Sequence, residues 1–371
     1  MPLHAVLDGT SVSAYCKRLP MAPDAGKHGS SALRIGVIGA GRIGAFHVRT
    51  LLELSGIASV TVCEADAAQA ARLAAELGVA IAATPEALIA GAVDAVVIAT
   101  PTPAHAPMIR LAAEAGLPAF CEKPVALDLT AMDALVEDVE RAGTLVQIGF
   151  QRRFDAGYLA ARAAIADGTL GRLLIARLAT HDPAPPAEAY IAGSGGIFRD
   201  LHIHDFDVLR FVTGEEIVEV YADGAVRETP WFADHDDVDV AAAVLKLSSG
   251  ALAILSGTRH DALGYDVRLE AFGTRDSVAA GLDARSPIRS LEPGVAQPGV
   301  PAYGDFMQRF QPAYEAELAA FVATVIDGGP SACTLHEARA ALLVALAADR
   351  SRNERRPVAV GEGVHTPVTA G

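Results

Sequence analysis

The stretch SGGIFRDLHIHDFDVLRF, residues 194–211, carries the residue types needed for proton transfer. Asp200, His204 and Asp207 recur at intervals of four and three residues, the spacing that places side chains on one face of a helix. A carboxylate one helical turn from an imidazole can fix its tautomer and raise its basicity. We therefore predict that His204, supported by Asp200, accepts a proton, as a general base does when an alcohol is oxidised.

Two neighbouring residues of the same stretch, His202 and Asp205, fall outside this face. We expect them to face solvent or to bond locally. Other interpretations of the stretch stay open, because His and Asp side chains can ligate a metal ion and because Asp200 can simply cap a helix. No Cys/His spacing elsewhere in the sequence supports a metal site, so we expect none.

A glycine-rich segment supplies a second motif. GAGRIG, residues 39–44, places Gly39, Gly41 and Gly44 in a GxGxxG pattern with Arg42 and Ile43 inside it. A strand-like run precedes the motif and helical periodicity follows it, which is the context in which these glycines bind a dinucleotide. Its diphosphate would lie at the N-terminus of the helix. A purely structural turn is the alternative.

Glu64 ends the next strand-like run, 20 residues after Gly44. A carboxylate there can accept hydrogen bonds from both ribose hydroxyls and would repel a 2′-phosphate. Ala65 follows it, and we expect the nearest arginines, Arg42 and Arg72, to be solvated or to line the diphosphate. The sequence therefore favours NAD over NADP, unless Glu64 merely ends a strand.

Two more segments end strand-like runs at one predicted edge of the sheet. They are ATPTPAH, residues 99–105, with Thr100, Pro101 and His105, and CEKP, residues 121–124, with Glu122 and Lys123. In a doubly wound sheet this edge faces the ligand, so we expect cofactor contacts from these five residues. Lys123 could also bind a substrate hydroxyl and stabilise a developing alkoxide. Alternatively, residues 99–105 only form a loop, and Lys123 is an ordinary surface lysine.

The elements around these motifs predict an α/β protein. Strands and helices alternate from Leu33 to Phe150, as in a parallel sheet with right-handed crossovers. Beyond Phe150, longer strand-like runs joined by turns such as Ser249-Gly250 are typical of a largely antiparallel sheet. We expect two final helices near 312–327 and 335–350, and a Pro- and Gly-rich loop at 281–304 that is long enough to line a site.

This pattern divides the chain into three parts. We expect a flexible extension at 1–31, an NAD-binding Rossmann domain at 32–150, and a substrate-binding and oligomerisation domain at 151–371. The last helices of the third part could pack back on the Rossmann domain.

Composition narrows the classes of partner. Acidic residues outnumber Lys and Arg by 45 to 30, and the net charge of −15 disfavours nucleic acid and anionic membranes. No apolar run is long enough for a membrane span, and the first 31 residues do not resemble a secretory signal. The four cysteines, Cys16, Cys63, Cys121 and Cys333, form no CxxC pair, which favours a reducing cytoplasm. We expect Cys63 and Cys121 to be buried free thiols.

Three motifs in order, GAGRIG, CEKP and the D-x-x-x-H of residues 200–204, resemble the glucose–fructose oxidoreductase/inositol dehydrogenase (Gfo/Idh/MocA) family. Longer strings are similar to bacterial inositol 2-dehydrogenases, and the likeness runs from about Leu33 to Val360. These strings are GFQRRFDAGY, HDPAPP, SGGIFRDLHIHDFD, GYDVRLEAFG and RFQPAYEAEL.

The resemblance implies a Rossmann domain followed by an α+β domain with an open, mostly antiparallel sheet, and a substrate between that sheet and the nicotinamide. It assigns Lys123 to the reacting hydroxyl, and Asp200 with His204 to a proton-accepting dyad. Four further residues match or lie near substrate-contacting positions of the family, namely Arg152, Asp182, Asp207 and Tyr314. Leu263 departs from the family pattern, because it replaces the first tyrosine of a YGYD string and removes a polar ring from the expected pocket wall.

The expected activity is NAD-dependent oxidation of one secondary hydroxyl of a cyclic polyol, with myo-inositol, oxidised to 2-keto-myo-inositol, as the first choice. A dehydrogenase of another inositol or of a pyranose sugar is one alternative. A catalytically silent NAD-binding regulator is another. The resemblance also implies that another subunit covers the open sheet, as is common in this family. We therefore expect a homotetramer.

Overall fold

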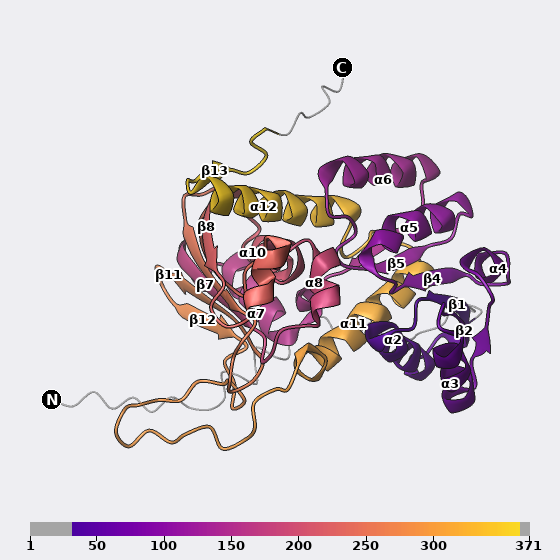
Figure 1. Cartoon of the computed structure of the whole chain (residues 1–371), viewed down its shortest axis with the longest axis horizontal. Helices are drawn as coiled ribbons and strands as arrows, with labels where there is room; N and C mark the ends of the chain where they lie inside the picture. Colours follow the sequence, from indigo (N-terminus) through magenta and orange to yellow (C-terminus); the bar gives the residue numbers. More distant parts are fainter. Residues whose placement is uncertain (1–31, 364–371) are drawn as a thin grey trace. The chain divides into compact units, whose positions relative to one another are not determined.

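The computed structural model describes residues 32–363, so the extension expected at 1–31 lies outside the described residues. The described chain builds two sheets, a six-stranded parallel sheet followed by a seven-stranded mixed sheet. Both are seen in Figure 1, where the labelled elements of the first sheet are drawn in indigo and purple. The predicted α/β architecture is confirmed.

The first sheet is a doubly wound Rossmann sheet with the strand order β3-β2-β1-β4-β5-β6. Its strands are β1 (Leu33–Ile38), β2 (Ile57–Cys63), β3 (Ala80–Ile81), β4 (Ala95–Ile98), β5 (Ala119–Glu122) and β6 (Val146–Gly149). The helices between them are α2 (Arg42–Glu53), α3 (Ala67–Leu77), α4 (Pro85–Ile89), α5 (His105–Glu114) and α6 (Leu129–Ala142). All strand pairs are parallel, so their carboxyl ends meet at one edge.

Local sequence explains where these helices begin and end. Asp66 accepts hydrogen bonds from the backbone of the first turn of α3, and Gly78 ends the helix with a positive φ of 68°. Asp128 and Gly143 play the same two parts for α6. Polar N-caps and left-handed glycines satisfy helix ends in this way, so the boundaries follow from the chain itself.

The second sheet has the order β12-β11-β7-β10-β9-β8-β13. Its strands are β7 (Leu173–His181), β8 (Ile217–Ala225), β9 (Val240–Leu247), β10 (Leu252–Thr258), β11 (Asp266–Gly273), β12 (Ser277–Ala280) and β13 (Val358–Ala359). Every pair is antiparallel except β7 with β10, where Thr258 is aligned with His181. This parallel pair brings the ends of β7 and β10 together.

Helices cover one face of the second sheet (Figure 1). They include α7 (Ala156–Ala166), α10 (Ile203–Thr213) and α12 (Leu335–Glu354). The remaining helices of this half are α8 (Glu188–Ser194), α9 (Ile197–Asp200) and α11 (Phe306–Asp327). The strands alternate accordingly, and in β10 Ala253 and Leu255 are buried while Leu252 and Ile254 are exposed. The other face of the sheet therefore carries exposed apolar side chains.

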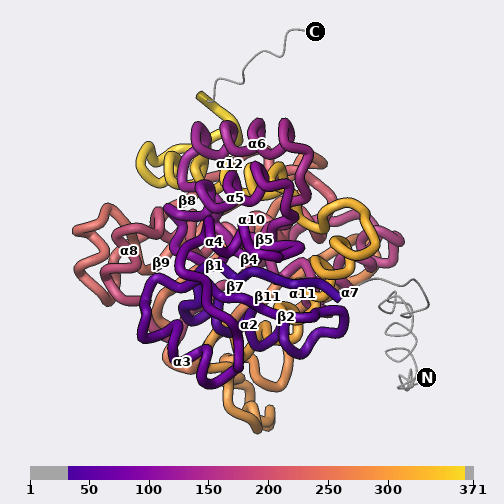
Figure 2. Tube along the Cα trace, turned by 90° about the vertical axis from the view of Figure 1, so that its right-hand side faces the viewer, coloured from indigo at the N-terminus to yellow at the C-terminus, as the bar shows by residue number. Residues whose placement is uncertain are grey.

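The last two long helices also enter the cores of the Rossmann sheet, whose elements face the viewer in Figure 2. Leu318 and Phe321 of α11 pack in one core with residues of β1, β2 and α2. Ala338 and Leu342 of α12 pack in another with residues of β4, β5, α5 and α6. The two halves of the chain are thus joined through shared hydrophobic cores.

Two helix boundaries differ from the sequence prediction. The helix expected from residue 312 begins at Phe306, because Asp305 caps it by accepting a hydrogen bond from Gln308 N, and it continues through Pro312. The single helix expected around Asp200 and Asp207 is in fact two, α9 and α10, separated at residues 201–202. Within residues 32–363, no helix is long and apolar enough to cross a membrane.

Candidate active site

The glycine-rich turn between β1 and α2 has the geometry expected of its motif. Gly39 has a φ of 86°, and a Cβ there would lie 2.8 Å from the backbone of Ala99 and Thr100. A Cβ on Gly44 would collide with the Gly39 carbonyl, whereas one on Gly41 would meet no atom within 4 Å. Gly39 and Gly44 are therefore fixed by packing, while Gly41 borders open space.

The start of α2 fits an anionic group such as the diphosphate of NAD. Among the described residues, no side chain caps this helix end, and its first turn, which contains Arg42 and Ile43, holds no acidic residue. Helix N-termini with free N–H groups favour anions. The 12-residue helix thus presents unblocked donors beside the open space at Gly41.

Glu64 is held against the glycine-rich turn. Its Oε2 atom accepts a 2.6 Å hydrogen bond from the Ala40 N–H, and its Oε1 atom accepts one of 2.9 Å from Asp66 N–H. The carboxylate therefore lies beside residues 39–41, where an adenosine ribose would bind in a Rossmann domain.

The loop after β4 is tied to the loop after β5 by His105. The Nε2 atom of His105 lies 2.7 Å from the Thr100 carbonyl oxygen, and its Nδ1 atom lies 2.8 Å from that of Pro124. His105 is buried, so it shapes the two loops from inside, while Pro101 is exposed. The Thr100 hydroxyl is buried and has no hydrogen-bond partner among the described residues.

Glu122 is the last residue of β5 and faces the interior of the Rossmann half. Its Oε1 atom lies 2.7 Å from Nε2 of His47 on α2, and both side chains are almost fully buried. This pair fixes the end of β5 immediately before Lys123. We therefore assign Glu122 a supporting position beneath the loop.

Lys123 meets Asp200 at the break between α9 and α10. Because the chain turns at residues 201–202, the Asp200 carbonyl accepts a 3.1 Å hydrogen bond from Lys123 Nζ. The same Nζ atom lies 3.4 Å from Asp200 Oδ1. The break thus makes a main-chain oxygen available to the lysine.

The Asp200 carboxylate is surrounded by donors. Oδ2 accepts a 2.6 Å hydrogen bond from Arg259 Nη2, and Oδ1 accepts one of 2.7 Å from the Tyr190 hydroxyl. Arg259 also donates a 2.9 Å bond to Asp182. Burial raises the pKa of Asp200, but Lys123, Arg259 and Tyr190 outweigh it and bring the pKa to about 2. Asp200 is therefore a permanent anion at neutral pH.

His204 does not use Asp200 as its partner, so the predicted support of this imidazole by the Asp200 carboxylate is wrong. Asp200 ends α9 and His204 is the second residue of α10, and the carboxylate is already occupied by other donors. His204 Nδ1 is buried without a partner among the described residues. Burial, Lys123 and Arg152 hold the pKa of His204 well below 6.5. The imidazole is therefore neutral at neutral pH, and its basicity is lowered.

Two predicted substrate contacts are instead engaged in buried ion pairs. Arg152, expected at the substrate, donates a 2.6 Å bond to Asp205 and a 3.1 Å bond to Thr180. Asp207 pairs with the adjacent Arg153 at 2.6 and 2.8 Å. Both predicted residues are almost inaccessible, because the neighbouring arginines of the QRRF turn each take a different aspartate of α10.

His202 and Asp205 bond to each other and do not face solvent. His202 Nδ1 lies 2.8 Å from Asp205 Oδ2, and both residues are fully buried. Tyr314 is also buried, in an aromatic group with Phe46, whose ring centroid is 5.7 Å away. The structure thus brings together Lys123, Asp182, Asp200 and their donors, and leaves Arg152, Asp207 and Tyr314 in the packed interior.

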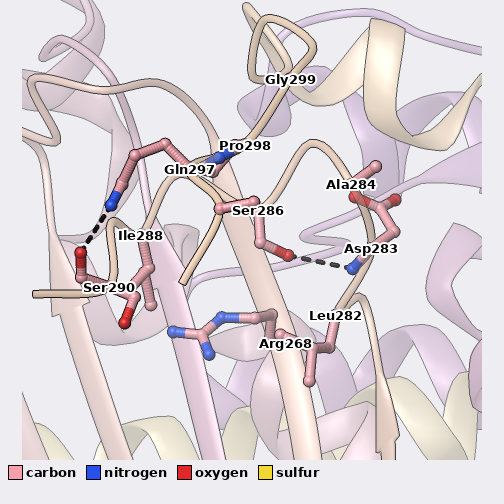
Figure 3. Close-up of a pocket in the computed structure, with 11 residues that line it drawn as sticks. Arg268, Leu282, Asp283, Ala284, Ser286, Ile288, Ser290, Gln297, Pro298 and Gly299 are labelled. Carbon is pink, nitrogen blue, oxygen red and sulfur yellow. Dashed lines mark hydrogen bonds between the residues drawn. The ribbon is translucent and has the colours of Figure 1, made fainter. Parts of the chain in front are cut away.

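The loop expected to line a site, residues 281–304, lines a different hollow. Figure 3 shows this cavity of about 650 Å³ between the loop and Arg268 of β11, with Ser286 bonded to Asp283 N and Gln297 to the Ser290 carbonyl. None of the predicted site residues lines it. Leu263 is exposed, with 41% of its surface accessible.

One group of side chains has the composition of a metal site. Ligand atoms of His181, Asp261 and Asp266 lie within 4.8 Å of one another. However, Arg268 Nε contacts both Asp266 oxygens, at 2.8 and 3.1 Å. Arg268 already neutralises the Asp266 carboxylate, so we interpret the three residues as part of an ion-pair network and not as a metal site.

Sequence reasoning missed Arg259 and Tyr190. A signal existed for Arg259, since charged residues follow directly on the apolar run that becomes β10, and β10 ends beside His181. Tyr190 lies in AEAYIAG, where neither residue type nor spacing marks it.

Comparison with known proteins gives two family matches that together cover most of the described chain. Residues 33–150 match the oxidoreductase family with an NAD-binding Rossmann fold, and residues 158–279 match the GFO/IDH/MocA C-terminal domain. The first match spans the six strands of the Rossmann sheet, whereas the second begins within α7, ends within β12 and leaves out β13.

Individual relatives cover nearly the whole chain. Myo-inositol dehydrogenase Hyg17 of Streptomyces leeuwenhoekii is 40% identical over 86% of this chain and 97% of its own length. The scyllo-inositol 2-dehydrogenase (NAD(+)) of Bacillus subtilis is 36% identical over 88% and 96%. A crystal structure of scyllo-inositol dehydrogenase from Lactobacillus casei with NAD(H) and scyllo-inositol has a TM-score of 0.81 at 29% identity, covering 89% of this chain and 99% of that one.

These matches agree with the geometry at the glycine-rich turn, where the open backbone at Gly41 and the uncapped start of α2 suit a dinucleotide. The chain therefore belongs to the Gfo/Idh/MocA family and is an NAD-dependent dehydrogenase of the inositol-dehydrogenase type.

Proposed function

We propose that the protein oxidises one secondary hydroxyl of a cyclic polyol, with myo-inositol, converted to 2-keto-myo-inositol, as the preferred substrate. The observation that carries this proposal is the grouping of an ammonium, a permanent carboxylate and a neutral imidazole beside the carboxyl end of β5. Lys123 lies within 3.4 Å of Asp200 and close enough to His204 to lower its pKa.

The three residues divide the work of removing hydrogen from an alcohol. The glycine-rich turn would hold NAD, which would supply the acceptor for the hydride of the hydroxyl carbon. His204 is neutral, so its imidazole can take the hydroxyl proton. Lys123 donates a hydrogen bond to the same oxygen and stabilises the negative charge that develops on it. Asp200 balances the ammonium charge.

Glu64 and the residues of the two loops would hold the coenzyme. We propose that the Glu64 carboxylate exchanges its bond with Ala40 N–H for the ribose hydroxyls, and that Gly39, Gly41, Arg42, Ile43 and Gly44 surround the diphosphate. Thr100 and Pro101 would line the crevice, while His105 and Glu122 support its loops from within.

The polar lining supports a polyhydroxylated substrate. Lys123, Asp182, Asp200 and Arg259 offer donors and acceptors in one place, and a site built to bond hydroxyls rejects analogues that lack them. The relatives include both myo- and scyllo-inositol dehydrogenases. We favour myo-inositol on the resemblance of the longer sequence strings, and Leu263 makes another inositol or a pyranose the alternative.

The proposal is tested by NADH formation over a panel of inositols and pyranose sugars. We expect the highest kcat/KM with myo-inositol. Activity only on a sugar would move the substrate to the alternative. NAD binding without reduction by any of these compounds would favour a silent regulator and contradict the proposal.

A variant of the base tests the assigned chemistry. His204→Ala should lower kcat by roughly 10²–10⁴-fold, the usual range for loss of a general base, without weakening NAD binding. His336→Ala is the matched control, because His336 is an exposed histidine paired with Glu140 on the surface. A kcat for His204→Ala within about threefold of the wild-type value would show that His204 is not the general base.

We also propose that the protein is a homotetramer in which the open face of the second sheet is covered by another subunit. Five exposed apolar residues of this sheet support the proposal, namely Leu174, Val218, Val244, Leu252 and Ile254. Light scattering should give a tetrameric mass, and Val244→Asp with Ile254→Asp should dissociate it. A monomeric wild type would contradict the proposal.

The thiols support a reducing compartment such as the cytoplasm. Cys63, Cys121 and Cys333 are buried and unpaired, as expected for the first two. Cys16 lies outside the described residues.

A further inference from the structure

The Asp200 carboxylate accepts hydrogen bonds from two side chains besides Lys123. Arg259 occupies its Oδ2 atom at 2.6 Å, and the Tyr190 hydroxyl occupies Oδ1 at 2.7 Å. Lys123 Nζ is the third donor and lies 3.4 Å from the same Oδ1 atom. Both carboxylate oxygens are thus bonded before the lysine is counted.

The distances rank these contacts by strength. Hydrogen bonds to a carboxylate are typically about 2.5–2.7 Å from a hydroxyl and about 2.7–2.9 Å from a charged nitrogen. Tyr190 and Arg259 reach such distances, whereas Lys123 stays beyond them and makes its shorter contact, 3.1 Å, with the Asp200 carbonyl. The ammonium is therefore kept beside the carboxylate without closing on it.

Tyr190 reaches this carboxylate from a part of the chain that contributes little to the core. It lies on α8, and 51% of its surface is exposed even though its hydroxyl meets the buried Asp200. A phenylalanine would keep the ring and remove only the hydroxyl. Arg259 is different, because it is 3% exposed and also neutralises Asp182.

We propose that Tyr190 is a positioning residue whose hydroxyl occupies Asp200 Oδ1 and so keeps Lys123 directed at the substrate hydroxyl. This inference rests on the proposed function. Without the hydroxyl, Lys123 becomes the only donor to Oδ1 and can close into a full ion pair. The ammonium then offers less stabilisation to the developing alkoxide. Tyr190 itself touches no reacting atom and acts through Asp200.

Removal of the single hydroxyl tests the proposal. Tyr190→Phe should lower kcat by roughly tenfold to a hundredfold, the range that one hydrogen bond to a charged group accounts for. The Kd for NAD, measured by fluorescence titration, should not change. The matched control is Tyr303→Phe, which removes a 2.9 Å tyrosine–aspartate bond to Asp283 outside the site. Wild-type kcat in Tyr190→Phe would overturn the inference.

A double-mutant cycle distinguishes a positioning role of Tyr190, exerted through Asp200, from a purely structural role in α8. If Tyr190 acts through Asp200, then Tyr190→Phe should have little further effect on kcat in an Asp200→Asn background. A residue that only supports α8 would lower kcat by the same factor in both backgrounds. Equal factors would therefore overturn the inference even if Tyr190→Phe is slow.

A titration gives a readout that does not depend on turnover. Burial, followed by the charge of Asp200 and the bond to it, raises the pKa of the Tyr190 phenol. The near-ultraviolet difference between wild type and Tyr190→Phe should show a phenol that titrates above a free tyrosine, and Asp200→Asn should lower that pKa. If no polyol is oxidised, the proposed function fails; a phenol of ordinary pKa that ignores Asp200→Asn overturns the Tyr190 contact instead.

Discussion

The substitution Asp207→Asn distinguishes a role of Asp207 in substrate binding from a role in the stability of the fold. Its carboxylate receives two hydrogen bonds from Arg153, at 2.6 and 2.8 Å, and the side chains are 6% and 1% exposed for Arg153 and Asp207. Arg153 also contacts Glu337 at 2.8 Å. An isolated buried guanidinium is costly, so the pair should matter for folding more than for turnover.

The size of the effect follows from this geometry. Removing one partner of a buried ion pair costs about 3–5 kcal/mol. We expect Asp207→Asn to lower the free energy of unfolding by about 3 kcal/mol, at the lower end because Glu337 still contacts Arg153. The KM for the polyol should stay close to that of wild type.

Urea unfolding and steady-state kinetics on the same samples test this prediction. Asp138→Asn is the matched control, because Asp138 also accepts two arginine bonds, from Arg110 at 2.6 Å and from Arg141 at 2.8 Å, but lies on the surface with a side chain that is 36% exposed. It should leave the unfolding midpoint unchanged, since exposed pairs contribute little. A stable Asp207→Asn variant with a strongly raised KM would refute this reasoning and return Asp207 to the substrate.

Three further predictions concern the coenzyme, the base and metal ions. Glu64→Ser with Ala65→Arg should shift the ratio of kcat/KM for NAD and NADP toward NADP, whereas a wild-type ratio near one would remove Glu64 from the ribose. The free energy of unfolding should fall as pH drops below about 6.5, because His204 then protonates in the unfolded chain but not in the folded one, where its pKa is well below 6.5. Urea titrations above and below that pH should show a smaller fall in His204→Gln, and an identical fall would contradict the burial of a neutral imidazole. Exhaustive chelation should leave activity unchanged, and loss restored by zinc would point to His181, Asp261 and Asp266.

Local features of the sequence were enough to predict the Rossmann half. Gly39, Gly44 and the strand before them determine the turn by their own sterics, and this turn is found as expected. Lys123 follows β5 directly, so its place at the edge of a parallel sheet could be predicted without knowing its partners.

The contacts of the second half depend on distant residues, which local patterns do not reveal. Leu201 and His202 carry no helix-breaking signal, yet the helix is interrupted there, and Lys123 binds the Asp200 carbonyl across 77 positions. Arg259 reaches Asp182, the residue after β7, because β10 pairs with β7 in parallel, against the antiparallel pattern of the other strands.

Adjacent arginines illustrate the same limit. Arg152 and Arg153 stand side by side in the sequence, but a 3₁₀ turn over Gln151–Phe154 sends one to Asp205 and the other to Asp207. The charges suggest ion pairs, and only the fold decides which arginine takes which aspartate.

Oxidation of myo-inositol that carries deuterium at C2 tests the central proposal most directly. The reduced coenzyme and the ketone product would be examined by NMR after incubation with NAD. We expect deuterium in the reduced coenzyme and a ketone at C2, because the hydride would leave the carbon whose hydroxyl Lys123 and His204 engage. Reduced coenzyme without deuterium, or no reduction while NAD remains bound, would contradict it.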